Sequence, residues 1–453
     1  MSMVLVHPAV DGLGGYARIP HSKPHMQRSI LLGLLANTPS VVLNPAWSSE
    51  ARSLFEAAQR LGMTVADQTA HQVSFCGVGR SIQVPGTALE SIGSAFNLRT
   101  MAAVAALARG DTILEGNASM LARPVRDYLG FITELGGDVE DLSTSRNLRI
   151  RVRGSRRLGG TAHIDTRHSS QVLTSLLLVA PLAEDPVRIN CSQGRGVGQG
   201  YVDLTVAMMR ERGAWVESTE SGFVVRPGMY RSGVHEIASD FTALSYLAGT
   251  VATAESGHVT IRDYIPSQLG PEREFLHVLR QLGIRTTHDP ATHTLLIERV
   301  EPTSRHVEID ARNIPTVVPT LAAMAPFVEP RVTVHHAAHV NNHKCRRVDM
   351  MLEQLRHMGC SIAPTYTADG EVDGFGTPSG RQEPVGGVTA ESHGDHRIFM
   401  SLATAALGAR LSTAINGAEH LHASFPDYFT VLERVGADFD AARTPDGVLS
   451  PAR

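Results

Sequence analysis

The feature that most constrains this chain is a helix–glycine–strand pattern that recurs six times. In each copy an amphipathic segment ends at a glycine and a short alternating segment follows, with the glycines at Gly62, Gly136, Gly213, Gly283, Gly359 and Gly436. Consecutive glycines lie between 70 and 77 residues apart. A glycine there lets a helix end in the left-handed conformation without the steric cost of a Cβ atom. Repeats of this length are too long for a solenoid and predict pseudo-symmetric α/β subdomains.

A second type of helix precedes these units. It is apolar on all sides and leads through a tight turn into a strand, as in residues 99–117, 173–190, 244–263 and 398–416. A helix that is hydrophobic all round is buried, whereas a helix with one charged face borders solvent. Each repeat is therefore expected to contribute one inner helix, one outer helix and several strands.

The composition excludes several classes of protein. The 453 residues are 42% hydrophobic and carry a net charge of −4, so the chain can form a core and is not a general binder of nucleic acids or anionic membranes. No apolar run approaches the roughly 18 residues of a spanning helix, and residues 1–16 lack the pattern of a signal peptide. The four cysteines show no CxxC spacing. These observations predict a cytoplasmic protein without a nucleic-acid or membrane partner, and we expect a monomer.

The use of basic residues is very uneven. Lys23 and Lys344 are the only lysines among 41 basic residues. A coding bias accounts for the excess of arginine, but an ammonium group that titrates readily is not replaced by a guanidinium. The two lysines are therefore candidates for functional residues.

Several segments together resemble one known family. They include ARIPHSKPHMQRSILLGLLA (17–36), HSSQVLTSLLLVAPLA (168–183), GDHR (394–397) and SFPDYFTVL (424–432). Over nearly its whole length the chain resembles the 5-enolpyruvylshikimate 3-phosphate synthases, which are enolpyruvyl transferases. The resemblance implies an α/β fold of two domains, each an inside-out α/β barrel of three βαβαββ repeats around inner helices. It implies domain bounds of 1–19 plus 239–453 and of 20–238, with the active site in the cleft between the domains.

The residues also indicate a phosphorylated, carboxylate-bearing substrate. Ser169, Ser170 and Gln171 are expected to open a helix, where backbone N–H groups and hydroxyls converge on an anion; simple N-capping is the alternative. The resemblance places the substrate phosphate on the two serines. It further implies substrate contacts from Lys23, Arg28 and Tyr201, and an anion cage of Arg123, Arg347 and Arg397. Thr316 is expected to join the substrate contacts and His396 the anion cage. The stretch GRGVGQG (194–200) fits no phosphate-loop pattern.

At several positions the chain departs from the family pattern. The resemblance implies an acidic residue where Thr316 stands, a glutamate where Lys344 stands and a lysine where Ala423 stands. Ala95 and Phe96 replace a glycine-threonine turn beside the enolpyruvate donor. Threonine does not act as a general base at neutral pH, and the loss of one acid–base group typically costs about 10²–10⁴-fold in rate.

These departures lead to the hypothesis that the chain eliminates phosphate from shikimate 3-phosphate or a close relative instead of transferring enolpyruvate. Lys344 is the expected base, with a pKa lowered by burial and neighbouring arginines. His343 and His339 are alternatives with pKa values near neutrality, and Lys23 helps to hold the leaving phosphate. Genuine enolpyruvyl transfer and a non-catalytic ligand-binding role remain the other readings. We expect no cofactor and no metal, since His335, His336, His339 and His343, or His420 and His422, show no metal-ligand pattern with an acidic residue.

Overall fold

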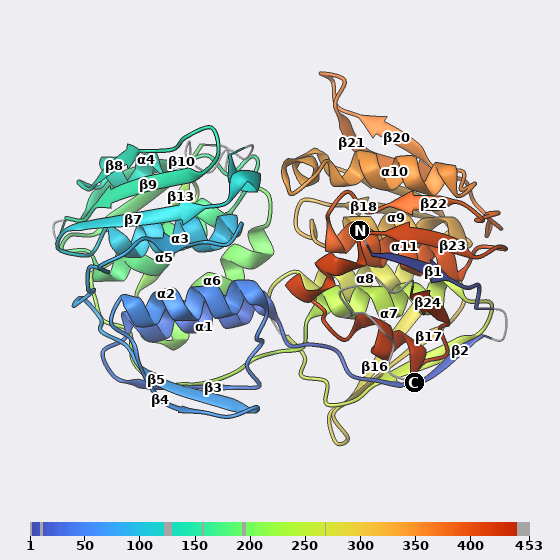
Figure 1. Cartoon of the computed structure of the whole chain (residues 1–453), viewed down its shortest axis with the longest axis horizontal. Coiled ribbons are helices and arrows are strands. Elements are labelled where there is room, and N and C mark those ends of the chain that lie inside the picture. The colour runs from blue at the N-terminus through green and yellow to red at the C-terminus, as the bar shows by residue number, and fades with distance from the viewer. Residues whose placement is uncertain are drawn as a thin grey trace. The chain divides into compact units, whose positions relative to one another are not determined.

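The computed structural model describes residues 2–9, 12–121, 129–155, 158–192, 196–267 and 269–441. The chain divides into two compact units (Figure 1). Unit 1 comprises Met1–Pro20 and Ala238–Arg453, and unit 2 comprises His21–Ile237. Unit 1 is therefore discontinuous in sequence, because the chain leaves it after its second strand and returns after unit 2 is complete.

Each unit contains three four-stranded sheets among the described residues. The sheets of unit 2, in spatial order, are β14 (Val234–Glu236), β3 (Pro39–Leu43), β5 (Gln72–Cys76) and β4 (Thr64–Gln68); β6 (Leu89–Glu90), β7 (Asp111–Gly116), β9 (Leu148–Arg153) and β8 (Asp138–Asp141); and β10 (Gly160–Ile164), β11 (Val187–Cys191), β13 (Gly222–Val225) and β12 (Val216–Thr219).

The sheets of unit 1 are β16 (Ile284–Asp289), β17 (Thr294–Arg299), β15 (Gly257–Ile261) and β2 (Leu13–Ala17); β18 (His306–Asp310), β19 (Arg331–His335), β21 (Val372–Thr377) and β20 (Ala363–Tyr366); and β22 (Thr389–Glu391), β23 (Thr413–Asn416), β1 (Met3–Val6) and β24 (Phe439–Ala441). All six sheets share one pattern, in which a parallel edge pair is followed by two antiparallel pairings. The six-fold repetition expected from the sequence is confirmed.

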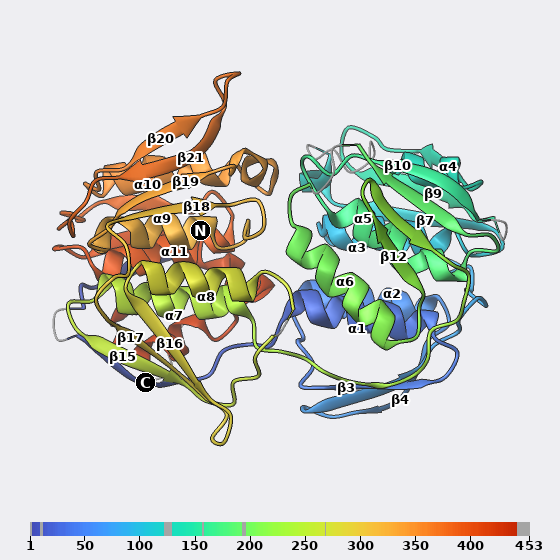
Figure 2. The ribbon, with the colours of Figure 1, turned by 180° about the vertical axis from the view of Figure 1, so that it is seen from behind.

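The inner helices are buried on nearly every side. In unit 2 they are α1 (Lys23–Leu35), α3 (Ala95–Ala105) and α5 (Gln171–Val179), and in unit 1 they are α7 (Phe241–Thr253), α9 (Val318–Met324) and α11 (His396–Leu407). The three inner helices of unit 1 pack against one another, with the sheets around them (Figures 1 and 2). Helices that are apolar all round thus form the centre of each unit, as their composition predicts.

The second set of helices comprises α2 (Ser49–Arg60), α4 (Gly130–Glu134), α6 (Gln199–Glu211), α8 (Glu272–Gln281), α10 (Arg347–His357) and α12 (Tyr428–Glu433). The six glycines of the repeat follow these helices, and each has a positive φ between 85° and 113°. A side chain would be strained in that conformation, so the repeated glycines mark helix ends, as predicted. In the part of the chain that the structure describes, every helix is too short or too polar to span a bilayer.

Candidate active site

Residues expected to bind the substrate gather in unit 2 at the start of α1. Lys23 is the first residue of this helix, and Ser22 caps it by accepting a hydrogen bond from the backbone of His25 at 3.5 Å. The Lys23 ammonium lies 3.0 Å from a carboxylate oxygen of Glu50 in α2, and the two side chains are 16% and 15% exposed. The Ser94 hydroxyl donates to the same oxygen at 3.3 Å. The ammonium is therefore oriented by a neighbouring helix.

Arg28 lies about one turn further along α1, and hydrogen bonds to neighbouring protein groups fix the orientation of its guanidinium. Its Nε donates to the Thr205 hydroxyl at 2.8 Å, and its two Nη groups donate to the carbonyl oxygens of Pro24 at 3.0 Å and Tyr201 at 3.1 Å. The guanidinium also lies against the rings of Phe96 and Tyr201, 5.5 and 5.9 Å from their centroids. Burial lowers the pKa of Arg28 to about 10, so the side chain stays a cation at neutral pH. The structure thus brings Arg28 and Tyr201 together.

Ser169, Ser170 and Gln171 open α5, as predicted. The Ser169 hydroxyl accepts a hydrogen bond from the Gln171 backbone at 3.2 Å. Arg99 of α3 donates to the Gln171 side-chain oxygen at 2.7 Å and to the Ser169 hydroxyl at 3.4 Å. Sequence reasoning missed Arg99, whose guanidinium adds a positive charge to this helix start. Ser170, the N-cap residue, makes no side-chain capping bond, and a buried arginine of α3 contacts the segment, so capping does not account for the whole arrangement.

Gly198 is the residue before α6, and it contacts Ser170 at the start of α5. It has a φ of 70°, and its carbonyl accepts a hydrogen bond from the Ser170 hydroxyl at 3.3 Å. A Cβ atom at position 198 would lie 2.6 Å from that hydroxyl oxygen. A residue with a side chain at position 198 would therefore be strained and would displace the Ser170 hydroxyl.

In unit 1 the candidate residues gather around a buried ion pair. Arg347, the first residue of α10, donates from Nε to the carboxylate of Asp395 at 2.8 Å, with side chains 5% and 0% exposed. Asp395 also caps α11 by accepting a hydrogen bond from the Arg397 backbone at 2.8 Å. Burial alone would raise the pKa of Asp395, but Arg347 and His396 hold it well below its usual range. This carboxylate is a fixed counter-charge for Arg347, and it does not exchange protons near neutrality.

Two expectations about the candidate bases are wrong. Burial, together with the charge of Arg347 and the nearby His339, holds the pKa of His343 well below its ordinary value, whereas a pKa near neutrality was expected. Lys344 was expected to be desolvated, but its side chain is exposed on the segment before α10. His339 is 7% exposed on the short helix η5 (Ala338–Asn342). The structure therefore separates the half-buried, neutral imidazole of His343 from the exposed amine of Lys344.

The remaining predicted residues are placed as follows. Thr316 precedes α9 and accepts a hydrogen bond from the Thr242 hydroxyl at 3.3 Å. His396 and Arg397 begin α11, where His396 is 2% exposed. Arg123 lies outside the described residues. Asp395 and Glu50 were missed by sequence reasoning, although Asp395 stands inside the quoted GDHR segment, immediately before an apolar helix, where an N-cap aspartate is expected.

The chain is similar to known proteins both in sequence and in fold. The sequence model of one protein family, described as EPSP synthase (3-phosphoshikimate 1-carboxyvinyltransferase), matches residues 9–432. This chain belongs to the EPSP synthase family. Among its relatives is a 3-phosphoshikimate 1-carboxyvinyltransferase of Halobacterium salinarum, 30% identical over 431 residues that cover 94% of this chain and 97% of the relative. Another, from Methanothermobacter thermautotrophicus, is 30% identical and covers 94% and 96% of the two chains.

The solved structures agree with the fold. An EPSP synthase from Acinetobacter baumannii superposes with a TM-score of 0.78 at 21% sequence identity, covering 98% of this chain and 100% of the other. A second structure of that enzyme gives a TM-score of 0.76. The two-domain enolpyruvyl-transferase fold expected from the sequence is thus confirmed for this member of the EPSP synthase family.

Proposed function

We propose that this chain binds shikimate 3-phosphate, or a closely related phosphorylated cyclohexene carboxylate, and catalyses the loss of its phosphate. The substrate class is supported by the names of the relatives and by the positive charges of Arg99 at the start of α5, Arg28 beside α6 and Lys23 at the start of α1. A phosphate and a carboxylate on one small ring require such fixed cations.

The observation that carries the proposed reaction is the chemical character of positions 316 and 344. Enolpyruvyl transfer requires groups that add and remove protons, and these positions hold a hydroxyl and an ammonium where the family pattern has carboxylates. The carboxylate beside Arg347 and His396 belongs to Asp395, which stays ionised because its pKa is far below the ordinary range. It is therefore a poor substitute for the missing proton-transfer groups.

Elimination of phosphate needs fewer proton-transfer groups than enolpyruvyl transfer, because it requires one base and groups that stabilise the leaving phosphate. A base removes a proton from the ring carbon next to the 5-hydroxyl, the C–H electron pair forms a new double bond to the carboxylate-bearing carbon, and the existing double bond shifts. The C–O bond to the phosphate then breaks, and phosphate leaves with that electron pair. The products are a cyclohexadiene carboxylate and inorganic phosphate. Lys344 is the proposed base; because its side chain is exposed, it acts through the fraction of its amine that is unprotonated, and the neutral imidazole of His343 is the alternative base. Ser169, Ser170 and Lys23 stabilise the departing phosphate.

Carboxyvinyl transfer from phosphoenolpyruvate is the second candidate. It is favoured by the names of the full-length relatives, and His343 or His339 would then carry out the proton transfers. A role in binding without turnover is the third reading. The three differ in what happens to phosphate and in whether a donor is needed.

The deciding experiment incubates the purified chain with shikimate 3-phosphate, with and without phosphoenolpyruvate, and measures inorganic phosphate and product mass. Elimination predicts phosphate release without the donor and a product lighter than shikimate. Release that strictly requires the donor, with a product heavier by the enolpyruvyl group, refutes it in favour of transfer. Binding without release in either mixture refutes both reactions.

Variants then test the residue assignments. Lys344→Met is expected to lower the rate by at least about 10²-fold, while Arg280→Met, which removes an exposed cation from α8 in the same unit, leaves it unchanged. Full activity of Lys344→Met would show that another group is the base even if phosphate is eliminated.

A further inference from the structure

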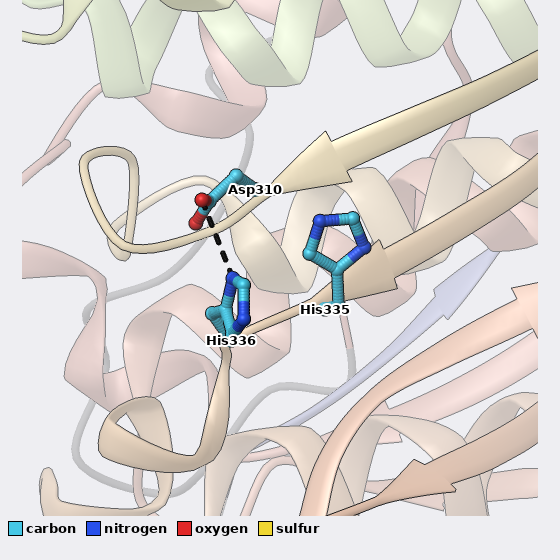
Figure 3. A group of neighbouring side chains, drawn as sticks. All are labelled: Asp310, His335 and His336. Carbon is cyan, nitrogen blue, oxygen red and sulfur yellow. Dashed lines mark ion pairs between the residues drawn. The ribbon is translucent and has the colours of Figure 1, made fainter.

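Three potential metal ligands meet at the ends of two neighbouring strands in unit 1. Asp310 ends β18 and His335 ends β19, and these parallel strands pair Asp310 directly with His335. His336 is the next residue. One ligand atom from each of the three side chains lies within 4.8 Å of the others. Figure 3 shows the Asp310 carboxylate facing the His336 ring, with the His335 ring beside it.

The spacing suits a small divalent cation. The Asp310 carboxylate oxygen and Nδ1 of His336 are 3.3 Å apart. In a tetrahedral zinc site with metal–ligand bonds of about 2.1 Å, two ligand atoms are about 3.4 Å apart. A ring nitrogen of His335 lies within 4.8 Å of both ligand atoms, so the His335 ring has to move closer for all three to bind one ion. Two imidazoles and one carboxylate form a ligand set that zinc and similar transition metals use, with water at the remaining position.

The backbone holds His336 in an uncommon conformation. Its φ is 57°, a left-handed value that is unfavourable for residues with a side chain. The Asp373 carboxylate stabilises this turn by accepting hydrogen bonds from the backbone of His336 at 3.0 Å and of Ala338 at 3.3 Å. A turn fixed in this way keeps the His336 ring turned toward Asp310.

Arg312 also holds the Asp310 carboxylate, including the oxygen that faces His336. Arg312 donates from its backbone at 3.0 Å and from Nε at 3.0 and 2.8 Å to the two oxygens. A carboxylate ligand is commonly oriented by such a hydrogen-bonding neighbour. The positive charge of Arg312 repels a cation, so the affinity is expected to be moderate.

The equivalent position of the repeat in unit 2 shows which of these contacts come with the fold and which are particular to the cluster of Asp310, His335 and His336. There Asp165 follows β10, and Arg167 grips it through the same contacts, from its backbone at 2.9 Å and from Nε at 3.0 and 2.9 Å. The last pair of β10 and β11 is Ile164 with Cys191. One position further, opposite Asp165, stands Ser192, which corresponds to His335. The aspartate–arginine contact thus belongs to the repeated fold, whereas the fold does not require the histidines.

We propose that Asp310, His335 and His336 bind one divalent transition-metal ion of the zinc type. Imidazole ligands favour such ions over Mg²⁺ and Ca²⁺, which prefer oxygen. The bound ion would join the end of β18, which leads to Thr316, to the segment that leads to His339. The site is independent of the proposed reaction, because its ligands are separate from the groups assigned to that reaction.

The experiment titrates the chelator-stripped full chain with Zn²⁺ against a chromophoric competitor, and records the absorption of the Co²⁺ form. One ion per chain and a spectrum without thiolate-to-cobalt bands are expected. His335→Gln and His336→Asn should each weaken binding at least about tenfold, since each removes one ligand. Asparagine tolerates the left-handed conformation at position 336, so that variant retains the turn.

His293→Asn is the matched control. His293 is exposed and also has a left-handed φ, 51°, but lies outside the cluster. Its substitution is expected to leave affinity and stoichiometry unchanged. Equal affinity in the native chain and in both cluster variants would overturn the proposal, as would cobalt bound through thiolate. Melting temperatures of the metal-free variants show whether each has folded.

Discussion

Glu272 offers a sharp test of how burial affects this fold. This residue is 3% exposed at the start of α8. It accepts hydrogen bonds from the Tyr264 hydroxyl and, at 3.1 Å, from the Ser267 backbone. It also borders a cavity of about 230 Å³ with a mainly apolar lining that includes Leu276 and Leu295. Burial raises the pKa of Glu272 to about 7 despite both hydrogen bonds.

The energetic consequence follows from linkage between protonation and folding. A carboxyl pKa raised from 4.5 to about 7 corresponds to about 3 kcal/mol. The folded state binds this proton more tightly than the unfolded state, so the stabilisation is fully present below about pH 4.5 and is lost as the pH rises through 7. At pH 8 the folded protein therefore bears the cost of a buried charge.

Glu272→Gln removes that charge while its shape is retained. The amide oxygen can accept from the Ser267 N–H, and the amide nitrogen can donate to the Tyr264 oxygen. We expect the variant to be more stable than the native chain by up to about 3 kcal/mol at pH 8 and to differ little at pH 5. With about 2.1 cal/mol/K of unfolding entropy per residue, this raises the melting temperature at pH 8 by about 3 °C if the whole chain unfolds together, and by about 6 °C if unit 1 unfolds alone.

The assay is a series of thermal melts of both proteins between pH 5 and pH 8. Glu353→Gln, which changes an exposed glutamate of α10, is the control and should follow the native chain at every pH. The reasoning is refuted if Glu272→Gln melts at or below the native temperature at pH 8, or if its difference from the native chain does not grow with pH.

Three further predictions concern the candidate site. Asp395→Asn leaves a buried guanidinium without its counter-charge and should cost about 3–5 kcal/mol in a denaturant titration, whereas Asp263→Asn, which breaks an exposed ion pair, should cost about 1 kcal/mol or less. Gly198→Ser places a Cβ atom 2.6 Å from a hydroxyl oxygen in a left-handed residue. It should lower stability by about 1–3 kcal/mol and weaken calorimetric binding of shikimate 3-phosphate; unchanged binding would separate this turn from the phosphate site. His343 should remain a neutral imidazole between pH 8 and pH 6, because its pKa lies well below the ordinary value; ring ¹⁵N shifts that report protonation in this interval would contradict that.

Much of the architecture follows from the order of residues along the chain. The conformation of the six helix-ending glycines and the difference between inner and outer helices depend on residues within a few positions of each other, so local rules suffice. The start of α5 at Ser169–Gln171 is another local feature, since the Ser169 hydroxyl accepts a hydrogen bond from the backbone two residues further along the chain.

The surroundings of the candidate site residues were harder to predict from the sequence than the architecture. The sequence indicated which residues were unusual, above all Lys23 and Lys344, but their surroundings depended on distant partners. Glu50, 27 residues from Lys23, orients that ammonium. The expected desolvation of Lys344 is absent because its segment lies at the surface. Burial depends on what packs against a segment, and local sequence does not specify that.

What the sequence alone determined was therefore a repeated α/β architecture, a family and a set of charged candidates. Only the tertiary structure paired Arg347 with Asp395, 48 residues away, and brought Asp310 beside His335 and His336 across a parallel strand pair. An acidic ligand for these histidines was not recognisable by spacing, since parallel strands are joined by a long crossover that separates neighbours in sequence. Local preferences decide where helices and strands form, whereas the packing of the repeats decides which strand ends and helix starts meet.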